Sequence, residues 1–407
     1  MILTAKTIVT GDGETVLRGH AVRIDATGKI AEVSPRQALA AAHPEEQILD
    51  FGDATILPGL IDMHIHLGSY IHYPDALRFN DHLIAYKALY AAQSALTVGV
   101  TTVRDMSSDH LLCEKLRYAG QKGYVTIPRI FHCDRGLTMT GGHGDQITNL
   151  KNECEVADGV DEIRKVIRKQ LRAGADWIKL MSSHRVMTRP EYTQEELNAA
   201  VEETHRLERK CAIHAGVGPS VGMAIEAGFD TIEHATYLTL EQAAEMKRKG
   251  LAWIPTIITY TDAYDRYKDA DGNPGPDAPL PVRSFWSFFK SAAESYKTNF
   301  KAIYDLGVTI AAGTDMVLFG APPAPVAKEL AFMVDYGITP VQAIRLGTHN
   351  GAKLLDIENS VGLVKAGLNA DLLVCDGDAS ADIRSLQRVR RVLMSGKTVY
   401  RPEAPEC

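Results

Sequence analysis

The feature that most constrains the fold is a regular alternation of short apolar runs with longer segments rich in helix formers. A strand followed by a helix, repeated along the chain, is typical of parallel β/α units, and eight such units close into a barrel. Eight apolar or β-branched runs occur, at residues 60–64, 101–104, 129–132, 177–180, 211–214, 231–234, 251–255 and 308–312. We therefore predict an α/β fold, a (β/α)8 TIM barrel that spans residues 56–354.

The two ends of the chain have a different character. Short strand-like runs between turn residues fill the first 55 residues, for example residues 7–10 before a Gly-Asp-Gly turn. The same pattern returns at residues 371–375 and 391–394. Two strand-rich ends around one barrel predict a smaller, β-sandwich-like domain built from residues 1–55 plus 355–407.

One connection stands out in the barrel. Residues 260–283, after the seventh run, are crowded with tyrosine, glycine and proline. A long connection of this composition predicts a lid or an interface loop.

Polar side chains stand at the ends of several apolar runs. His64 and His66 are two residues apart at the end of a strand, so their side chains project from the same face. Alone, this pair fits a metal site and two half-exposed histidines equally well. His214, His234 and Asp315 also follow apolar runs, and the carboxyl ends of barrel strands converge on one face. One such histidine is more often a core residue and one such aspartate a cap, but the five together predict a metal site.

Lys179 is unusual because it interrupts the apolar run of the fourth strand. A buried ammonium group is costly. One interpretation is a salt bridge to an inward carboxylate. The other is that the neutral amine adds carbon dioxide, which gives a carbamate able to bridge two cations about 3.5–4 Å apart.

Three stretches of sequence resemble the amidohydrolase superfamily, in its binuclear branch with a carboxylated lysine. Residues 57–66 read LPGLIDMHIH, which matches the first-strand signature of that superfamily, and residues 367–372 read GLNADL, which matches its return to the β domain. The stretch 140–145, TGGHGD, is similar to the prolidase-like and dipeptidase group, which is related to imidazolonepropionases and includes ochratoxin-hydrolysing members.

The resemblance implies a set of ligands and cofactors. His64 and His66 would bind the more buried metal together with Asp315, and His214 and His234 the more exposed one. Lys179, as N6-carboxylysine, would bridge both. Two divalent metal ions are expected, with zinc as the default, although several metals accept such ligands.

The same resemblance assigns residues to the substrate. His143 would polarise the scissile carbonyl, and Tyr260 would lie near the carboxylate or carbonyl of the substrate. A loop histidine that caps a turn and a buried aromatic residue are the competing interpretations. Arg185 departs from the small, glycine-rich sequence common in relatives, and it could hold a substrate carboxylate or be a solvated loop arginine.

The resemblance implies an enzyme that hydrolyses an amide or peptide bond of a small molecule, most simply a dipeptide, an N-acyl amino acid or an ochratoxin-type amide. Hydroxide held between the two metals would attack the carbonyl, and Asp315 would act as the base. A lactone or ester hydrolase and a deaminase on the same barrel are the alternatives. A catalytically silent protein of this fold is less compatible with the sequence, because all six metal-ligand positions are kept.

Composition limits the kinds of binding partner and the cellular location that we expect for this protein. A formal net charge of −7 without a basic run argues against nucleic acid and anionic membranes. Six scattered cysteines without a C-x-x-C pair predict reduced thiols and a cytoplasmic protein. No stretch reaches the roughly 18 apolar residues of a membrane span, and no signal peptide is visible at the N-terminus, although a chain trimmed of its signal would look the same. The resemblance suggests a homo-oligomer.

Overall fold

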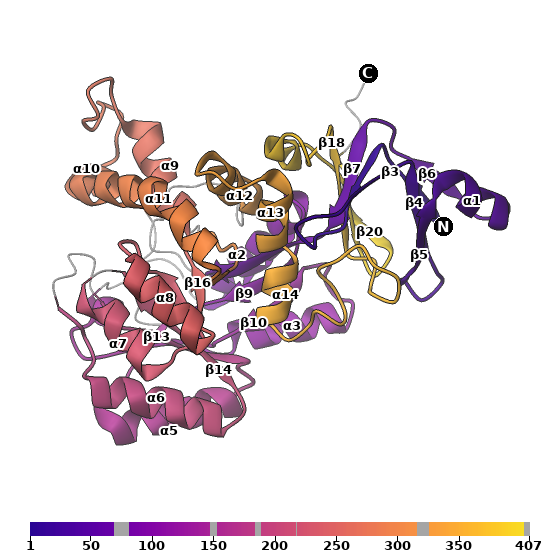
Figure 1. The fold of residues 1–407 in the computed structure, drawn as a ribbon. Coiled ribbons are helices and arrows are strands. Elements are labelled where there is room, and N and C mark those ends of the chain that lie inside the picture. Colours follow the sequence, from indigo (N-terminus) through magenta and orange to yellow (C-terminus); the bar gives the residue numbers. More distant parts are fainter. Residues whose placement is uncertain (69–80, 147–152, 184–188, 217, 316–324, 403–407) are drawn as a thin grey trace.

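The computed structural model describes residues 1–68, 81–146, 153–183, 189–216, 218–315 and 325–402. A barrel of parallel strands, surrounded by helices, carries a smaller β domain at one side (Figure 1). The N-terminus lies in that domain, and the last described strands lie there too. Residues from both ends of the chain therefore meet.

All eight predicted strand runs form barrel strands. They are β8 (Leu60–Ile65), β9 (Val100–Asp105), β10 (Arg129–His132), β13 (Trp177–Met181), β14 (Lys210–Ala215), β15 (Thr231–His234), β16 (Ala252–Ile254) and β17 (Thr309–Ile310). Neighbours pair in parallel from β8 to β10 and from β13 to β17. Backbone hydrogen bonds join the two groups, from Met63 to Ala312 and from Asp176 to His132, both 2.9 Å long. The TIM-barrel prediction is confirmed.

Helices cover the outside of this barrel, and apolar side chains fill the space between the helices and the strands. They are α2 (Asp81–Thr97), α3 (Leu112–Gln121), α5 (Gly159–Arg172), α6 (Gln194–Arg206), α7 (Pro219–Ala227), α8 (Leu240–Lys249), α11 (Trp286–Leu306), α12 (Val326–Asp335) and α13 (Pro340–Leu346). Helix α14 (His349–Leu354) belongs to a separate apolar cluster, in which Ala352 packs with Ile61 and Met63 of β8. Helix α6 begins at a capping box between Thr193 and Glu196, which satisfies two backbone donors at the helix start. Of the helices that the structure describes, none has both the length and the apolar character of a membrane span.

A short excursion that we did not predict follows β10. It contains β11 (Gly136–Thr138), the one-turn helix α4 (His143–Gln146) and β12 (Cys154–Val156). Strand β11 pairs in parallel with both β12 and β13. The excursion thereby carries His143 to the carboxyl side of the barrel strands.

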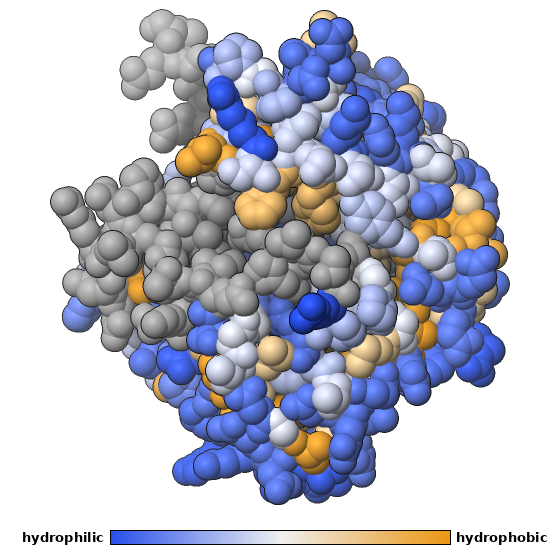
Figure 2. All heavy atoms as spheres, turned by 90° about the vertical axis from the view of Figure 1, so that its left-hand side faces the viewer, coloured by the Kyte–Doolittle hydropathy of each residue, from blue (hydrophilic) through white to orange (hydrophobic). Residues whose placement is uncertain are grey.

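The prediction that residues 260–283 form a loop is partly wrong. The first third of this stretch belongs to helix α9 (Ile257–Tyr267), and a second helix, α10 (Leu280–Ser284), precedes α11. Irregular chain is confined to residues 268–279, the proline- and glycine-rich part. This arm projects from the barrel (Figure 1), and the face that carries it has apolar side chains scattered among hydrophilic ones (Figure 2).

The smaller domain contains two sheets. One has the order β5 (Ile30–Pro35), β4 (His20–Ile24), β1 (Ile2–Thr4) and β6 (Ile48–Asp50); the other has the order β20 (Lys397–Tyr400), β19 (Val389–Met394), β18 (Leu372–Asp376), β7 (Ala54–Pro58), β2 (Thr7–Val9) and β3 (Val16–Arg18). Helix α1 (Arg36–Ala42) and the 3-10 helix Ile383–Gln387 accompany them. Strand β7 spans the predicted boundary at residue 55 and pairs with β18; the domain boundaries stay predictions.

Candidate metal centre

The six predicted metal ligands come from the carboxyl-terminal halves of five barrel strands or from the chain just after them. His64 is in β8 and His66 follows that strand. Lys179 is in β13, His214 in β14 and His234 at the end of β15. Asp315 lies five residues beyond β17. Because parallel barrel strands end on one face, six residues from separate parts of the sequence share one region.

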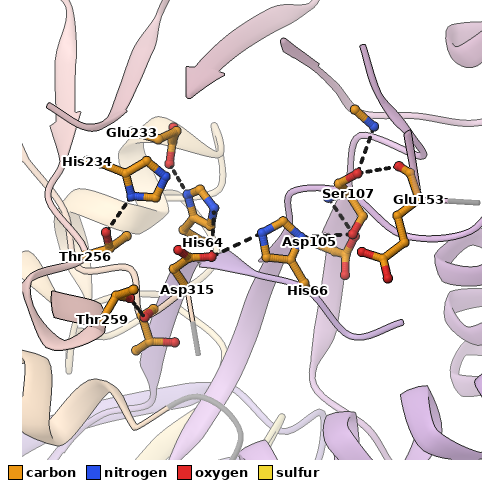
Figure 3. A network of polar contacts seen from close by, with 12 residues as sticks. His64, His66, Asp105, Ser107, Glu153, Glu233, His234, Thr256, Thr259 and Asp315 are labelled. Carbon is orange, nitrogen blue, oxygen red and sulfur yellow. Dashed lines mark hydrogen bonds and ion pairs between the residues drawn. The ribbon is translucent and has the colours of Figure 1, made fainter. Parts of the chain in front are cut away.

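His64, His66 and Asp315 form the tightest group, and their candidate ligand atoms all lie within 4.8 Å of one another. An oxygen of Asp315 is 3.2 Å from Nε2 of His66 and 3.5 Å from Nε2 of His64. Gly313 makes this approach possible, because a Cβ there would lie 2.8 Å from Cβ of His64. Figure 3 shows the three side chains facing one another.

The remaining histidines continue the cluster. The rings of His64 and His234 have centroids 5.0 Å apart, and those of His234 and His214 are 4.6 Å apart. Nε2 of His214 is buried and has no hydrogen-bond partner among the described residues. A buried nitrogen without a partner is costly, so its position fits coordination to a metal.

Lys179 is 1% exposed, and it lies close enough to Glu233, Asp315 and three of the histidines to affect their charges. Burial lowers the pKa of its ammonium group, against the carboxylates of Glu233 and Asp315, which raise it. A lowered pKa favours the neutral amine, the form that adds carbon dioxide. The environment therefore fits the carbamate interpretation, while the nearby carboxylates leave the salt bridge as the alternative.

The protonation states of the histidines also fit a metal. Burial lowers the pKa of His234 to about 4 and that of His214 well below its usual value. Burial, assisted by Lys179, does the same for His64. Neutral imidazole is the form that binds metals. The donor set of four imidazoles, one carboxylate and one modifiable amine suits two divalent cations.

Asp315 is ionised despite its burial. Burial raises the pKa of its carboxyl group, but contacts with His64, His66 and His234 outweigh that effect and hold the pKa well below its usual range. The pKa of His66 shifts in the opposite direction. Burial lowers this pKa, but the hydrogen bond to Asp315 and the charge of Asp315 raise it more, so that the net shift is upward. Asp315 thus offers a charged carboxylate that can serve as a metal ligand.

Two buried charges support His64, and the sequence did not lead us to either. Glu233 lies 2.6 Å from Nδ1 of His64 through one oxygen, and its other oxygen accepts a 2.9 Å hydrogen bond from Arg104. Both charged side chains are fully buried, and the guanidinium of Arg104 lies over the ring of Trp177. The available signal was a charge inside an apolar run, the same signal that singled out Lys179.

Other contacts orient the imidazoles with Nε2 towards the cluster. Nδ1 of His66 lies 3.0 Å from the carbonyl oxygen of Ser107, and Nδ1 of His234 lies 2.7 Å from the hydroxyl of Thr256 (Figure 3). Such partners hold a ligand histidine in one tautomer and one orientation. Asp62 acts differently, since it accepts hydrogen bonds from the backbone N–H of His64 and from Thr314.

The backbone itself is strained at this face. His234, Thr256 and Asp315 have φ values of 66°, 49° and 49°, in the left-handed region that L-residues seldom adopt. Each such residue costs on the order of 1–3 kcal/mol, and they concentrate at functional sites.

The structure places two of the three residues predicted to contact the substrate close to the histidine cluster. The ring of His143 stacks on that of His214, with centroids 4.5 Å apart and an angle of 17° between the planes. Tyr260 is 7% exposed, and it meets His234 edge-on at 6.0 Å while it packs against Phe288 and Tyr296. It is thus both a buried aromatic residue and a neighbour of the cluster. Arg185 lies outside the described residues.

Replacing Glu233 with glutamine should lower the affinity for the metal about 10–100-fold, because the negative charge that supports His64 is lost. The measurement is a competition titration of the metal-loaded protein with a chelator. Glu203→Gln is the matched control, since Glu203 is also a buried carboxylate paired with arginines, Arg168 and Arg206, but lies on helix α6. Equal affinity in wild type and Glu233→Gln would contradict the role of Glu233.

Comparison with known proteins places the chain in one group. The sequence model of the amidohydrolase family matches residues 55–399. Ochratoxinase of Aspergillus niger is 28% identical over 96% of this chain and 84% of its own length, and its crystal structure gives a TM-score of 0.82, covering 98% of this chain and 95% of its own.

Two further solved structures are similar over nearly all of both chains. A Xaa-Pro dipeptidase with bound methionine in the active site is 29% identical, with a TM-score of 0.84 over 98% of this chain and 99% of its own. A prolidase complexed with N-methylphosphonate-L-proline is 26% identical, with a TM-score of 0.82 over 98% of this chain and 99% of its own.

Proposed function

The chain belongs to the amidohydrolase family, and we propose that it hydrolyses the amide bond of a dipeptide or an N-acyl amino acid. That it is a hydrolase acting on amide bonds follows from the family and from its similarity to ochratoxinase and prolidases. The finer statements, about the substrate, the residue roles and the metals, are the proposal.

One observation carries the proposal. Four histidines, Asp315 and a buried lysine, all from strand ends of one barrel, face a common region in which three of them offer ligand atoms within 4.8 Å. A structural core would not place four imidazoles and a carboxylate together, because each buries polar atoms that need partners. Metal ions would provide those partners.

We assign His64, His66 and Asp315 to one divalent cation and His214 and His234 to the other, with carboxylated Lys179 shared between them. Zinc is the metal we propose, because it accepts imidazole and carboxylate oxygen alike. When bound, such cations would lower the pKa of a coordinated water molecule to about 7, so that hydroxide would be available at neutral pH.

The chain's own residues then have separate tasks. Asp315 would accept the proton of the attacking water and pass it to the leaving amine. His143, stacked on His214, would donate a hydrogen bond to the carbonyl oxygen as negative charge develops there. Tyr260 lies beside His234, where it would contact the carboxylate or carbonyl of the substrate.

The choice of substrate class rests on the relatives. Two of them are a Xaa-Pro dipeptidase and a prolidase, and a third is an ochratoxinase. Dipeptides and N-acyl amino acids share an amide bond next to a free carboxylate, which is the chemistry we propose for this site. The cytoplasmic location and the homo-oligomer remain predictions.

Parallel assays with a panel of dipeptides, a panel of N-acyl amino acids and a panel of lactones test the proposal. We expect turnover of at least one amide, loss of that turnover after chelation, and its return when zinc is added. Turnover of lactones alone would overturn the substrate class and favour the lactone or ester hydrolase. Release of ammonia from a cyclic amidine in place of amide cleavage would favour a deaminase.

A further inference from the structure

The chain that carries His143 has little structure of its own. Helix α4 is a single turn, and the N–H of His143 stands at its start. The first N–H groups of a helix have no acceptor within the helix, and one turn is not stable alone in water. The position of His143 therefore depends on anchors from elsewhere.

Three carboxylates hold this stretch. Asp158 accepts a 2.9 Å hydrogen bond from the N–H of Thr140, and Asp145 accepts a 2.8 Å hydrogen bond from that of Gly141. Glu191 accepts a 2.9 Å hydrogen bond from the N–H of His143 itself. Asp145 lies in the excursion after β10 and Asp158 follows that excursion directly, whereas Glu191 follows β13.

Glu191 is held in place by backbone hydrogen bonds in the connection between β13 and α6. Its own N–H donates a 3.0 Å hydrogen bond to the carbonyl of Ser182, and Ser183 pairs with Pro190 as an isolated antiparallel bridge. The contact with His143 therefore joins two neighbouring connections of the barrel. Arg185, outside the described residues, belongs to the same connection as Glu191.

The carboxylate of Glu191 also lies unusually close to the backbone of the His143 stretch. A Cβ on Gly142 would lie 2.8 Å from Oε2 of Glu191, so the carboxylate packs directly against the backbone there. That oxygen is buried and has no hydrogen-bond partner among the residues that the structure describes, and burial raises the pKa of the carboxyl group to about 7. Burying a carboxylate with one unpartnered oxygen is unfavourable, so fold stability alone does not explain it.

We propose that Glu191 is a positioning residue, which holds the backbone of His143 so that its imidazole stays stacked on His214. The proposal rests on the function proposed above, in which His143 acts on the scissile carbonyl. Loss of this hold would leave the substrate able to bind but would misplace the hydrogen-bond donor in the transition state. Such a defect lowers kcat more than it changes KM.

A double-mutant cycle tests the proposal. The variants are Glu191→Ala, His143→Ala and the double variant, assayed with the best amide of the panels. We expect Glu191→Ala to lower kcat about tenfold or more, with KM changed less than about threefold and with unchanged metal content. In the His143→Ala background the same change should have almost no further effect. An equal loss in both backgrounds would mean that Glu191 acts independently of His143 and would overturn the proposal.

Two further variants sharpen the test. Glu191→Gln keeps an oxygen that can accept the hydrogen bond of His143, so it should recover most of the lost kcat; activity as low as in Glu191→Ala would count against the proposal. Asp158→Ala removes an anchor of the same stretch at Thr140 and should reduce kcat much less. A loss equal to that of Glu191→Ala would mean that any loosening of the stretch suffices, and would overturn a specific role.

Hydrogen–deuterium exchange separates this proposal from the proposed function. Exchange of the segment that contains His143 should be faster in Glu191→Ala than in wild type, and unchanged in Glu202→Ala, whose carboxylate pairs with Arg164 on the outer helices. If wild type cleaves no amide, the proposed function fails, and faster exchange in Glu191→Ala still supports the anchoring of His143. Unchanged exchange overturns the anchoring whatever the activity.

Discussion

Replacing Asp315 with asparagine should lower kcat about 10³-fold while the fold and most of the metal remain. Removing a general base typically costs 10²–10⁴-fold. Asparagine keeps the size of the side chain and one oxygen near Nε2 of His66 and His64, which Asp315 approaches at 3.2 and 3.5 Å. It cannot accept a proton, whereas Asp315 is held ionised by its histidine neighbours.

The measurement is kcat with the best amide, accompanied by thermal unfolding and metal content. Asp134→Asn is a matched control, because Asp134 is also a buried aspartate just after a barrel strand, with a φ of 62° and a 2.7 Å contact to a histidine, His110. It lies outside the histidine cluster, and its variant should keep kcat within a few-fold. Near-full turnover in Asp315→Asn would refute the assignment of Asp315 as the base.

Replacing Lys179 with alanine should reduce the metal content from about two ions per chain to one or none, and activity should fall with it. The reason is that alanine can form no carbamate, so the histidine pairs would lose their shared ligand. Plasma mass spectrometry on protein produced with added zinc and bicarbonate measures the metal directly.

Lys210→Ala is the control for this experiment. Lys210 begins the next barrel strand, and its ammonium pairs with Asp356 at 2.7 Å. Its removal should leave the metal content unchanged. One ion per chain in wild type and in Lys179→Ala would mean that Lys179 is structural, and the mononuclear deaminase would become the better hypothesis.

The barrel could be predicted because the alternation of apolar runs and helical segments is repeated eight times. An error in the boundaries of any one run does not change the number of strands. The excursion after β10 could not, since β11 includes a glycine and β12 a glutamate, and neither lies in a longer apolar run as β16 and β17 do. Neither segment therefore gives the run of residues by which a strand is recognised. Tyr260 was placed in a loop because the proline-rich stretch begins soon after it, although the helix continues to Tyr267.

The cluster of predicted ligands was found because each polar residue ends or interrupts an apolar run. Its supports were harder to predict. Glu233 and His234 are adjacent, and a regular strand would send them to opposite faces; the φ of 66° at His234 breaks that rule and brings both towards His64. A left-handed residue other than glycine leaves no mark in sequence. Glu191 likewise carries no motif, because its role comes from two connections that meet only in the folded barrel.

The pairing of β7 with β18 has a consequence for folding during synthesis on the ribosome. Residues 54–58 are made early, but their partners at 372–376 emerge only after the whole barrel has been synthesised. Until then β7, whose five residues are buried in the folded protein, lacks a partner on the edge that later pairs with β18. Unpaired edges of this kind promote association between chains. Contacts between such distant residues form slowly, so the nascent chain should depend on chaperones longest at its N-terminal end.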